Sequence, residues 1–371
     1  MASGRRCPHL VMGGIGSEPK GQGHVPDAKK EIPFHTWFSP QYVYVRGRQL
    51  EGTFNSNPTI GCWLISALRV VRGWGAPFEE QWPYIGDIKS WPPKEPPHID
   101  EYAKENKIFA YHRVSSTHEC RLALAAGSFV TITVEITNSW STAKTGKIQL
   151  PKARNEITGG HCVSLFAYDD HKRLFKFQNS WGKEWGDTGC GYLPYRYVDL
   201  LLTEGYVIVP DRDDLGVEKS PGILERWWGI PAVLHGVLHG CEIRDSQSND
   251  RRGWAFAIQY DNYLNVEELF VRPNYRGKGY SKILCAHFEK LSSDLVMPLR
   301  FWISHADNNR NNMAIVRHMA DMHGFTLYNS SVRWAAFKIE KGRIPTQLGS
   351  HNKPDKAHRP LRSGISKYLS G

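Results

Sequence analysis

The sequence contains a cysteine, a histidine and an asparagine whose local settings suit nucleophilic catalysis. Cys62 opens the segment CWLISALRVVRG, in which apolar residues recur at helical spacing. The first turn of a helix has free N–H groups and a partial positive charge, so this place should stabilise a thiolate and lower the thiol pKa. A nucleophilic thiol also needs a base and a group that orients the base. His161 and Asn179 are the candidates for these two roles.

His161 and Asn179 lie at the ends of two segments that should form a hairpin. His161 opens the strand-like segment 161–168, and Asn179 directly follows the segment 173–178. The polar residues between the two segments predict a short turn. Antiparallel strands joined by a short turn place their outer ends side by side. We therefore expect His161 and Asn179 to be neighbours.

A second candidate site is the turn Arg276-Gly277-Lys278-Gly279, which lies between a strand-like and a helical segment. Glycines let the backbone turn sharply and present N–H groups to an anion at a helix N-terminus. Arg276 and Lys278 add positive charge. The turn therefore predicts a site for a pyrophosphate group.

The elements around these sites predict two domains and an α+β fold. In the first domain a helix at 62–73 precedes strands at 128–136, 161–168, 173–178 and 205–210. The charged segment 211–221 ends in proline and suits a linker. The second domain is expected to contain strands at 237–244, 254–260, 264–272, 299–304 and 332–339, with helices at 279–293 and 311–323. A length of 371 residues suits two ordinary domains.

The composition argues against a membrane protein and against a metal site. No run of eighteen apolar residues occurs, and residues 1–31 form a Gly- and Pro-rich arm without the apolar core of a signal peptide, which favours a cytoplasmic protein. The seven cysteines include no CxxC pair, so neither a zinc site nor a disulfide framework is expected. His235 and His239 have no evident third ligand, so we expect no metal.

Part of the net charge of +10 lies in the segment 341–371, which has seven basic residues and one acid. A basic tail can bind nucleic acid. It can equally be a solvated, flexible end. The segment has no interleaved aromatic residues apart from Tyr368, which weakens the nucleic-acid interpretation.

The first domain, residues 32–210, resembles the papain family of cysteine peptidases, especially its bacterial-type members. The similar motifs are Cys62–Trp63 at a helix start, Gly160–His161, the NSWG stretch 179–182, Trp185–Gly186, the WPY stretch 82–84 and the segment 191–198. The resemblance implies that the Cys62 thiolate attacks a peptide carbonyl and that His161 returns a proton to the leaving amine. It also implies that Asn179 holds the imidazole and that Trp181 shields their bond from water.

The oxyanion hole departs from the family pattern. The family places a glutamine six residues before the cysteine, and here this position is Ser56, flanked by Asn55 and Asn57. Loss of one such donor costs ~10²–10³ in rate. The amide of Asn55 or Asn57 is an alternative donor. The segment from Cys62 to Trp82 is also short. An active peptidase, a weakened or narrowly selective one, and an inactive peptide-binding module all remain open.

The second domain, residues 222–340, resembles the GNAT N-acetyltransferase superfamily. Arg276, Gly279 and, imperfectly, Ser281 match its acetyl-CoA-binding motif, and Gly324–Phe325 is also similar. The resemblance implies that acetyl-CoA is a cosubstrate, held by Phe270, Val271, Arg276, Gly277, Lys278, Gly279, Tyr280 and Ser281. The first helices of that fold are hard to find between residues 222 and 254.

The same resemblance suggests a base on the strand that precedes the glycine turn. Adjacent strand residues face opposite ways, so only one of Glu267 and Glu268 can reach a site, and we favour Glu268. Both could instead be surface or ion-paired acids, and His305 is a weaker candidate. Many family members protonate the CoA thiol with a tyrosine, whereas His318 is the nearest polar candidate here.

Together these features predict a bifunctional protein, of bacterial type, that cleaves a peptide or protein substrate and acetylates an amine. Domain order alone suggests that one substrate is processed twice. A different interpretation is an acetyl-CoA sensor that gates the protease. A third is nucleic-acid binding through the basic tail.

Overall fold

The computed structural model describes residues 38–56, 60–86, 90–210, 218–219, 224–231, 236–303, 326–331 and 336–341. The chain divides into two compact units, with the boundary between Asp211 and Arg212. Several predicted features lie outside the described residues: the arm 1–31, the helix 311–323, almost all of the tail, and Asn57, His235, His305, His318 and Gly324–Phe325.

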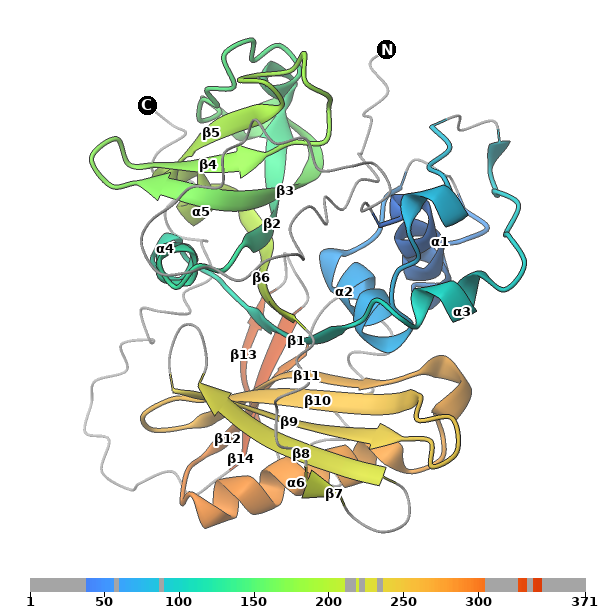
Figure 1. Cartoon of the computed structure of the whole chain (residues 1–371). Coiled ribbons are helices and arrows are strands. Elements are labelled where there is room, and N and C mark those ends of the chain that lie inside the picture. The colour runs from blue at the N-terminus through green and yellow to red at the C-terminus, as the bar shows by residue number, and fades with distance from the viewer. Residues whose placement is uncertain are drawn as a thin grey trace, which may run out of the picture. The chain divides into compact units, whose positions relative to one another are not determined.

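The first unit combines helices with a six-stranded antiparallel sheet. Figure 1 shows three helices gathered on one side of this unit: α1 (Pro40–Leu50), α2 (Leu64–Gly73) and α3 (Ile99–Ala103). The strand order is β1-β6-β2-β3-β4-β5. The strands are β1 (Ile108–Arg113), β2 (Val130–Thr137), β3 (Ile157–Asp169), β4 (Leu174–Gln178), β5 (Cys190–Pro194) and β6 (Leu202–Pro210). Two further helices, α4 (Thr117–Ala125) and α5 (Tyr195–Leu201), complete the α+β unit.

The predicted helix 62–73 and the four predicted strands of this unit are confirmed as α2, β2, β3, β4 and β6, with shifted ends. Helix α2 begins at Leu64 with Trp63 as its N-cap, so Cys62 directly precedes the helix. Helix α1 was not predicted. Ser39 caps it, because its Oγ accepts the Tyr42 N–H at 3.1 Å, and Pro40 occupies its first turn.

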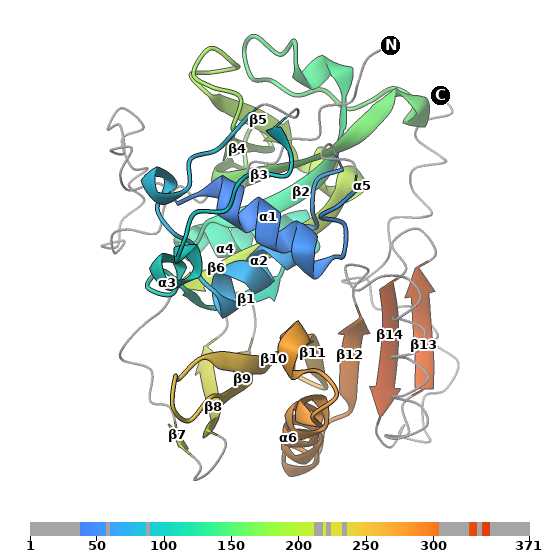
Figure 2. The same cartoon turned by 90° about the vertical axis from the view of Figure 1, so that its right-hand side faces the viewer.

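The second unit is an eight-stranded sheet in the order β13-β14-β12-β11-β10-β9-β8-β7. Its strands are β7 (Glu218–Lys219), β8 (Leu224–Pro231), β9 (Val237–Arg244), β10 (Arg251–Gln259), β11 (Leu264–Val271), β12 (Leu299–Ile303), β13 (Thr326–Ser331) and β14 (Ala336–Lys341). Figure 2 shows α6 (Tyr280–Asp294) beside this sheet. Its buried face, which includes Leu284 and Phe288, packs on Ala255, Ala257 and Val266.

The predicted strands 237–244, 254–260, 264–272 and 299–304 and the predicted helix 279–293 are confirmed as β9, β10, β11, β12 and α6, with small shifts at some ends. Residues 224–231 form a further strand, β8, where the first helices of an acetyltransferase were sought. The last predicted strand, 332–339, overlaps β14, and β13, which pairs with β14, was not predicted. The predicted linker contains strand β7, which pairs with β8. Within the described stretches, no helix is long and apolar enough to cross a membrane.

Candidate active site

His161 and Asn179 form a buried hydrogen-bonded pair. Their side chains are 2 % and 4 % exposed, and His161 Nε2 lies 2.8 Å from Asn179 Oδ1. The hairpin of β3 and β4 brings them together, with Ser164 opposite Gln178 in its ladder. Asn179 Oδ1 also accepts the Ser180 N–H at 2.8 Å, which fixes the amide with its oxygen toward the imidazole. The imidazole therefore donates from Nε2 and keeps Nδ1 for proton exchange.

Aromatic rings enclose the imidazole of His161. The Trp181 ring lies 4.7 Å from it, and the Trp140 ring meets it edge-on at 5.8 Å. Trp185 contacts both of these residues: its ring lies 5.5 Å from that of Trp181, and its Nε1 donates to the Trp140 carbonyl at 2.7 Å. A hydrogen bond shielded in this way is stronger than one in water.

Two carboxylates occupy the N-terminal end of α2, next to Cys62. The Trp63 N–H donates to Glu51 Oε1 and the Leu64 N–H donates to Glu204 Oε2, each at 2.8 Å. Glu51 follows α1, and Glu204 lies on β6, so these bonds tie the start of α2 to both a helix and the sheet. Carboxylates are favourable partners for the free N–H groups at a helix start.

The sheet places His161 close to this end of α2. Thr133 of β2 pairs with Cys162 on one side and with Glu204 on the other, so these three residues form a row across the sheet. Cys162 directly follows His161, and Glu204 holds Leu64 two residues after Cys62. The start of α2, which follows Cys62, is thus joined through Glu204 and Thr133 to the strand that carries His161.

The prediction that the helix end lowers the Cys62 pKa is wrong. Burial raises the pKa of the thiol well above its usual value, and Glu51, Cys162 and Glu204 raise it further, whereas Arg48 lowers it. Burial also raises the pKa of Glu51 and of Glu204 to about 7. The two carboxyl groups accept hydrogen bonds from the N–H groups at the helix start, which would otherwise stabilise a thiolate.

Ser56, at the position of the missing glutamine, has its hydroxyl engaged within its own turn. Ser56 Oγ donates to the Thr53 carbonyl at 2.6 Å and accepts from Arg48 Nη2 at 3.0 Å. A hydroxyl has one proton, so the Ser56 side chain has none left for an oxyanion in this arrangement. Asn55 is exposed, and Asn57 lies outside the described residues.

The glycine turn of the second unit has the backbone that was expected of it. Gly277 and Gly279 adopt left-handed φ angles of 75° and 81°, with open space where a Cβ would stand. Gly279 is the N-cap of α6. Arg276, Lys278 and Ser281 are exposed, and Arg276 Nε donates to the Val271 carbonyl at 3.1 Å. The positive end of the helix dipole and two cations make this end of α6 suitable for an anion.

Other predicted cofactor residues face the protein interior. Tyr280 is 7 % exposed, and its hydroxyl accepts from Arg252 Nη1 at 2.7 Å, so only its backbone could meet a ligand. Phe270 is 3 % exposed and its ring packs at 4.8 Å from Trp254. Val271 packs at the edge of the α6 core. Glu268 is buried beside a bulge in β11, whereas Glu267 is half-buried and accepts from Asn265 Nδ2 at 2.6 Å.

Metal-ligating side chains do not gather in groups of three or more within the residues that the structure describes. His239, one of the two histidines weighed as a metal pair, lies with its Nε2 2.8 Å from Gln259 Oε1.

A large part of the first unit matches a known family model. Residues 53–197 match the family model described as papain family cysteine protease. An uncharacterized peptidase C1-like protein of Acanthamoeba polyphaga mimivirus is 27% identical over 186 residues, which cover 47% of this chain and 58% of that protein. The chain thus spans little more than half the length of this curated relative.

Solved structures also show partial similarity to this chain. Xylellain, a cysteine protease from Xylella fastidiosa, is 29% identical with a TM-score of 0.43, over 47% of this chain and 70% of that one. The PaiA N-acetyltransferase of Thermoplasma acidophilum, solved with coenzyme A, is 15% identical with a TM-score of 0.24, over 29% of this chain and 61% of that one.

Proposed function

With a papain-family cysteine peptidase domain in its first unit, we propose that this protein hydrolyses peptide bonds through Cys62, His161 and Asn179. The observation that carries the proposal is the buried contact of 2.8 Å between His161 Nε2 and Asn179 Oδ1, beside the helix start that bears the only cysteine of that segment. Nothing in this chemistry calls for a metal, because thiol, imidazole and amide supply every proton transfer.

Each group has a defined task in this mechanism. His161 Nδ1 takes the proton of the Cys62 thiol as sulfur attacks the peptide carbonyl. The imidazolium then protonates the leaving amine as the C–N bond breaks, which leaves a thioester. Water, deprotonated by the same nitrogen, hydrolyses the thioester and restores the thiol. Because the pKa of Cys62 is raised, the resting enzyme holds a neutral thiol, and the base is essential to the attack.

Substitution of the thiol tests this proposal. Cys62→Ala should lower hydrolysis of a mixed peptide library by at least ~10³-fold, because the nucleophile is lost. Cys120→Ala, which changes a buried cysteine of α4, is the matched control and should keep its activity. Asn179→Ala should lower kcat with little change in KM. Hydrolysis that survives in Cys62→Ala would exclude this thiol as the nucleophile.

An inactive peptide-binding module is the main alternative for the first unit. The raised pKa of Cys62 and the engaged hydroxyl of Ser56 favour it. This alternative expects wild type and Cys62→Ala to bind peptides alike, with no cleavage by either protein. Mass spectrometry of peptides after incubation separates the two functions directly.

For the second unit, we propose an acetyl-CoA site at the start of α6. Strands β11 and β12 run parallel, yet they pair only from Leu264 to Val266. The remainder of β11, up to Val271, pairs with β10 alone. The two strands therefore separate toward their carboxyl ends, where open sheets bind ligands, and the glycine turn stands at that end. Glu268 is the proposed base for an amine acceptor.

Ligand-induced stabilisation tests the acetyl-CoA site. Acetyl-CoA at 100-fold above its Kd should stabilise the unit that binds it by about 2.7 kcal/mol. Gly279→Ala should abolish this shift, because an alanine is strained at a φ of 81° and its methyl group would enter the anion site. Gly127→Ala, another left-handed glycine with a φ of 80°, is the control for the backbone effect.

The fate of the cleaved product decides how the two proposed activities relate. Cleavage exposes a new amine, which is the chemical class that an N-acetyltransferase consumes. Acetylation of that new N-terminus in the presence of acetyl-CoA would support processing of one substrate by both units. Binding of acetyl-CoA that changes the rate of cleavage, without acetyl transfer, would support the sensor instead.

A further inference from the structure

Arg48 is a fully buried cation that donates hydrogen bonds to the turn 53–56, which precedes Cys62 in the sequence. Its Nε donates to Thr53 Oγ1 at 2.8 Å, and its Nη2 donates to the Thr53 carbonyl and to Ser56 Oγ, the latter at 3.0 Å. Its Nη1 donates to the Tyr44 hydroxyl at 2.8 Å. The planar guanidinium suits this arrangement, because it directs several donors at fixed angles.

Two aromatic side chains, which also contact each other at 5.4 Å, pack against Arg48. The guanidinium lies 5.5 Å from the Tyr44 ring and 5.4 Å from the Trp91 ring. Trp91 also reaches the same turn, because its Nε1 donates to the Phe54 carbonyl at 3.0 Å. Residues 53–56 are therefore held by contacts from both α1 and Trp91.

Helix α1 also contacts the nucleophile itself. A Cβ placed on Gly47 would lie 3.1 Å from Cys62 Sγ, so the thiol packs against the helix backbone one residue before Arg48. The positive charge of Arg48 opposes the effect of Glu51 and Glu204 on the Cys62 pKa. One side chain thus acts on both the turn and the thiol.

We propose that Arg48 is a positioning residue of the active site, which fixes the turn 53–56 beside Cys62 and sets a positive charge next to the sulfur. This inference rests on the proposed peptidase function. The turn stands where the papain family places its oxyanion donor, so movement of the turn or of the thiol should impair the chemical step more than substrate binding.

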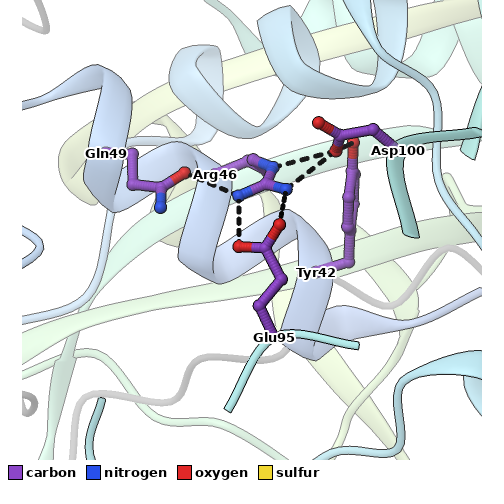
Figure 3. A network of polar contacts seen from close by, with 5 residues as sticks. All are labelled: Tyr42, Arg46, Gln49, Glu95 and Asp100. Carbon is purple, nitrogen blue, oxygen red and sulfur yellow. Dashed lines mark hydrogen bonds and ion pairs between the residues drawn. The ribbon is translucent and has the colours of Figure 1, made fainter. Parts of the chain in front are cut away.

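Arg46 provides a matched control on the same helix. Its partners differ from those of Arg48: it donates to Glu95 and Asp100, which belong to the segment after Trp91, and to Gln49 (Figure 3). Figure 3 also shows the Tyr42 hydroxyl on Asp100, at 2.7 Å. Loss of Arg46 should weaken the fold locally, yet none of these contacts involves the turn 53–56 or the thiol.

The experiment compares Arg48→Lys, Arg48→Gln, Thr53→Val and Arg46→Gln in the full chain. Two quantities are measured: the rate of Cys62 alkylation by iodoacetamide between pH 6 and 10, corrected with Cys62→Ala, and kcat and KM for a cleaved peptide. Arg48→Gln should shift the alkylation profile to higher pH. Arg48→Lys keeps the charge, so its profile should stay near wild type while kcat falls on the order of 10- to 100-fold. Arg46→Gln should keep both quantities within about twofold of wild type.

Thr53→Val removes one acceptor of Arg48 at a half-buried position, so it tests the turn even where Arg48→Gln fails to fold. A kcat in Arg48→Lys and Thr53→Val equal to that of Arg46→Gln would overturn the proposal. If hydrolysis depends on Cys62 but the Arg48 and Thr53 variants keep the kcat of wild type, the role of Arg48 is refuted and the peptidase function stands. A wild type without hydrolysis would refute the peptidase function, and the alkylation profiles would still decide whether Arg48 acts on the thiol.

Discussion

Cys62 lies between opposing charges, and this balance decides how its thiol can react. Glu51 and Glu204 bind the N–H groups that follow it, and both have pKa values raised to about 7. As pH rises through 7 the two carboxyls ionise, and each negative charge makes the thiolate less favourable. The same rise in pH that should activate the thiol therefore also opposes its ionisation.

Glu204→Gln should make the thiol more reactive above pH 7. Glutamine can still accept the Leu64 N–H, but it has no charge to repel a thiolate. The thiol pKa should fall, and iodoacetamide should alkylate Cys62 faster at pH 8. Below pH 6, where Glu204 is protonated, variant and wild type should react alike. Glu119→Gln, at a buried carboxylate of α4, is the control. Equal profiles at all pH values would refute this account of the raised pKa.

Gly47→Ala should separate reactivity from stability. Alanine is favoured over glycine in a helix interior by up to ~1 kcal/mol, so α1 itself should tolerate the change. The added methyl group would stand 3.1 Å from Cys62 Sγ, closer than a normal contact, and should displace the sulfur. We expect slower alkylation of Cys62 with a melting temperature close to that of wild type. A normal alkylation rate in a folded variant would show that the thiol does not need this space.

At the residue scale, local sequence identified the pair His161 and Asn179, because a hairpin brings its own ends together. It did not identify Glu204, which lies 142 positions after Cys62 and meets α2 only through the folded sheet. Glu51 is near in sequence, yet nothing in its setting shows that it accepts the Trp63 N–H. Electrostatic surroundings built by distant segments cannot be derived from spacing alone.

Helix α1 shows how tertiary packing overrides local preference. Its sequence PQYVYVRGRQL is rich in β-branched and aromatic residues and contains a glycine, so neither propensity nor period indicates a helix. Burial on most sides compensates, because Tyr42, Val45 and Arg48 are almost fully enclosed. The predicted helix α2 has a regular apolar period instead, which is why it could be found.

Ser39→Ala should destabilise the first unit through the cap of α1. Ser39 Oγ accepts the Tyr42 N–H and donates to the Trp82 carbonyl at 2.6 Å, in a fully buried position. Loss of the cap costs about 1 kcal/mol, and the buried carbonyl left without its donor adds a similar cost. Ser116→Ala removes the cap of α4, where Ser116 Oγ accepts the Glu119 N–H, and should cost only the first amount. Urea unfolding measures both variants, and equal costs would contradict this assignment.

The second unit shows the same division between local and distant information. The glycine turn and α6 follow from sequence, because their signals are adjacent residues. The separation of β11 from β12 does not, since pairing between strands 28 residues or more apart leaves no local pattern. Nor did the sequence indicate that Tyr280 points inward, which depends on its bond with Arg252 from β10.

At the scale of the whole molecule, stability should depend on pH through His112. His112 lies on β1, is 1 % exposed, and burial lowers its pKa to about 4. The unfolded chain protonates this histidine near pH 6.5, so between pH 6.5 and 4 the unfolded state binds one proton more than the folded state. Stability from this group is therefore complete above pH 6.5 and is lost as pH falls toward 4.

His112→Phe should remove this loss and make the first unit more resistant to acid. A shift from 6.5 to about 4 corresponds to ~3 kcal/mol, so the variant should gain up to that amount relative to wild type at pH 4. Glu51 and Glu204 act in the opposite direction: their raised pKa values favour the folded state at low pH, and this contribution is lost as pH rises through 7. Wild type and His112→Phe share those carboxyls, so the difference between their unfolding free energies isolates His112.

His171→Gln, at an exposed position of the β3–β4 turn, should leave the pH dependence of stability unchanged. A constant difference between His112→Phe and wild type from pH 4 to 7 would mean that His112 has the same pKa in the folded and the unfolded chain, and that the interior around β1 accommodates its charge.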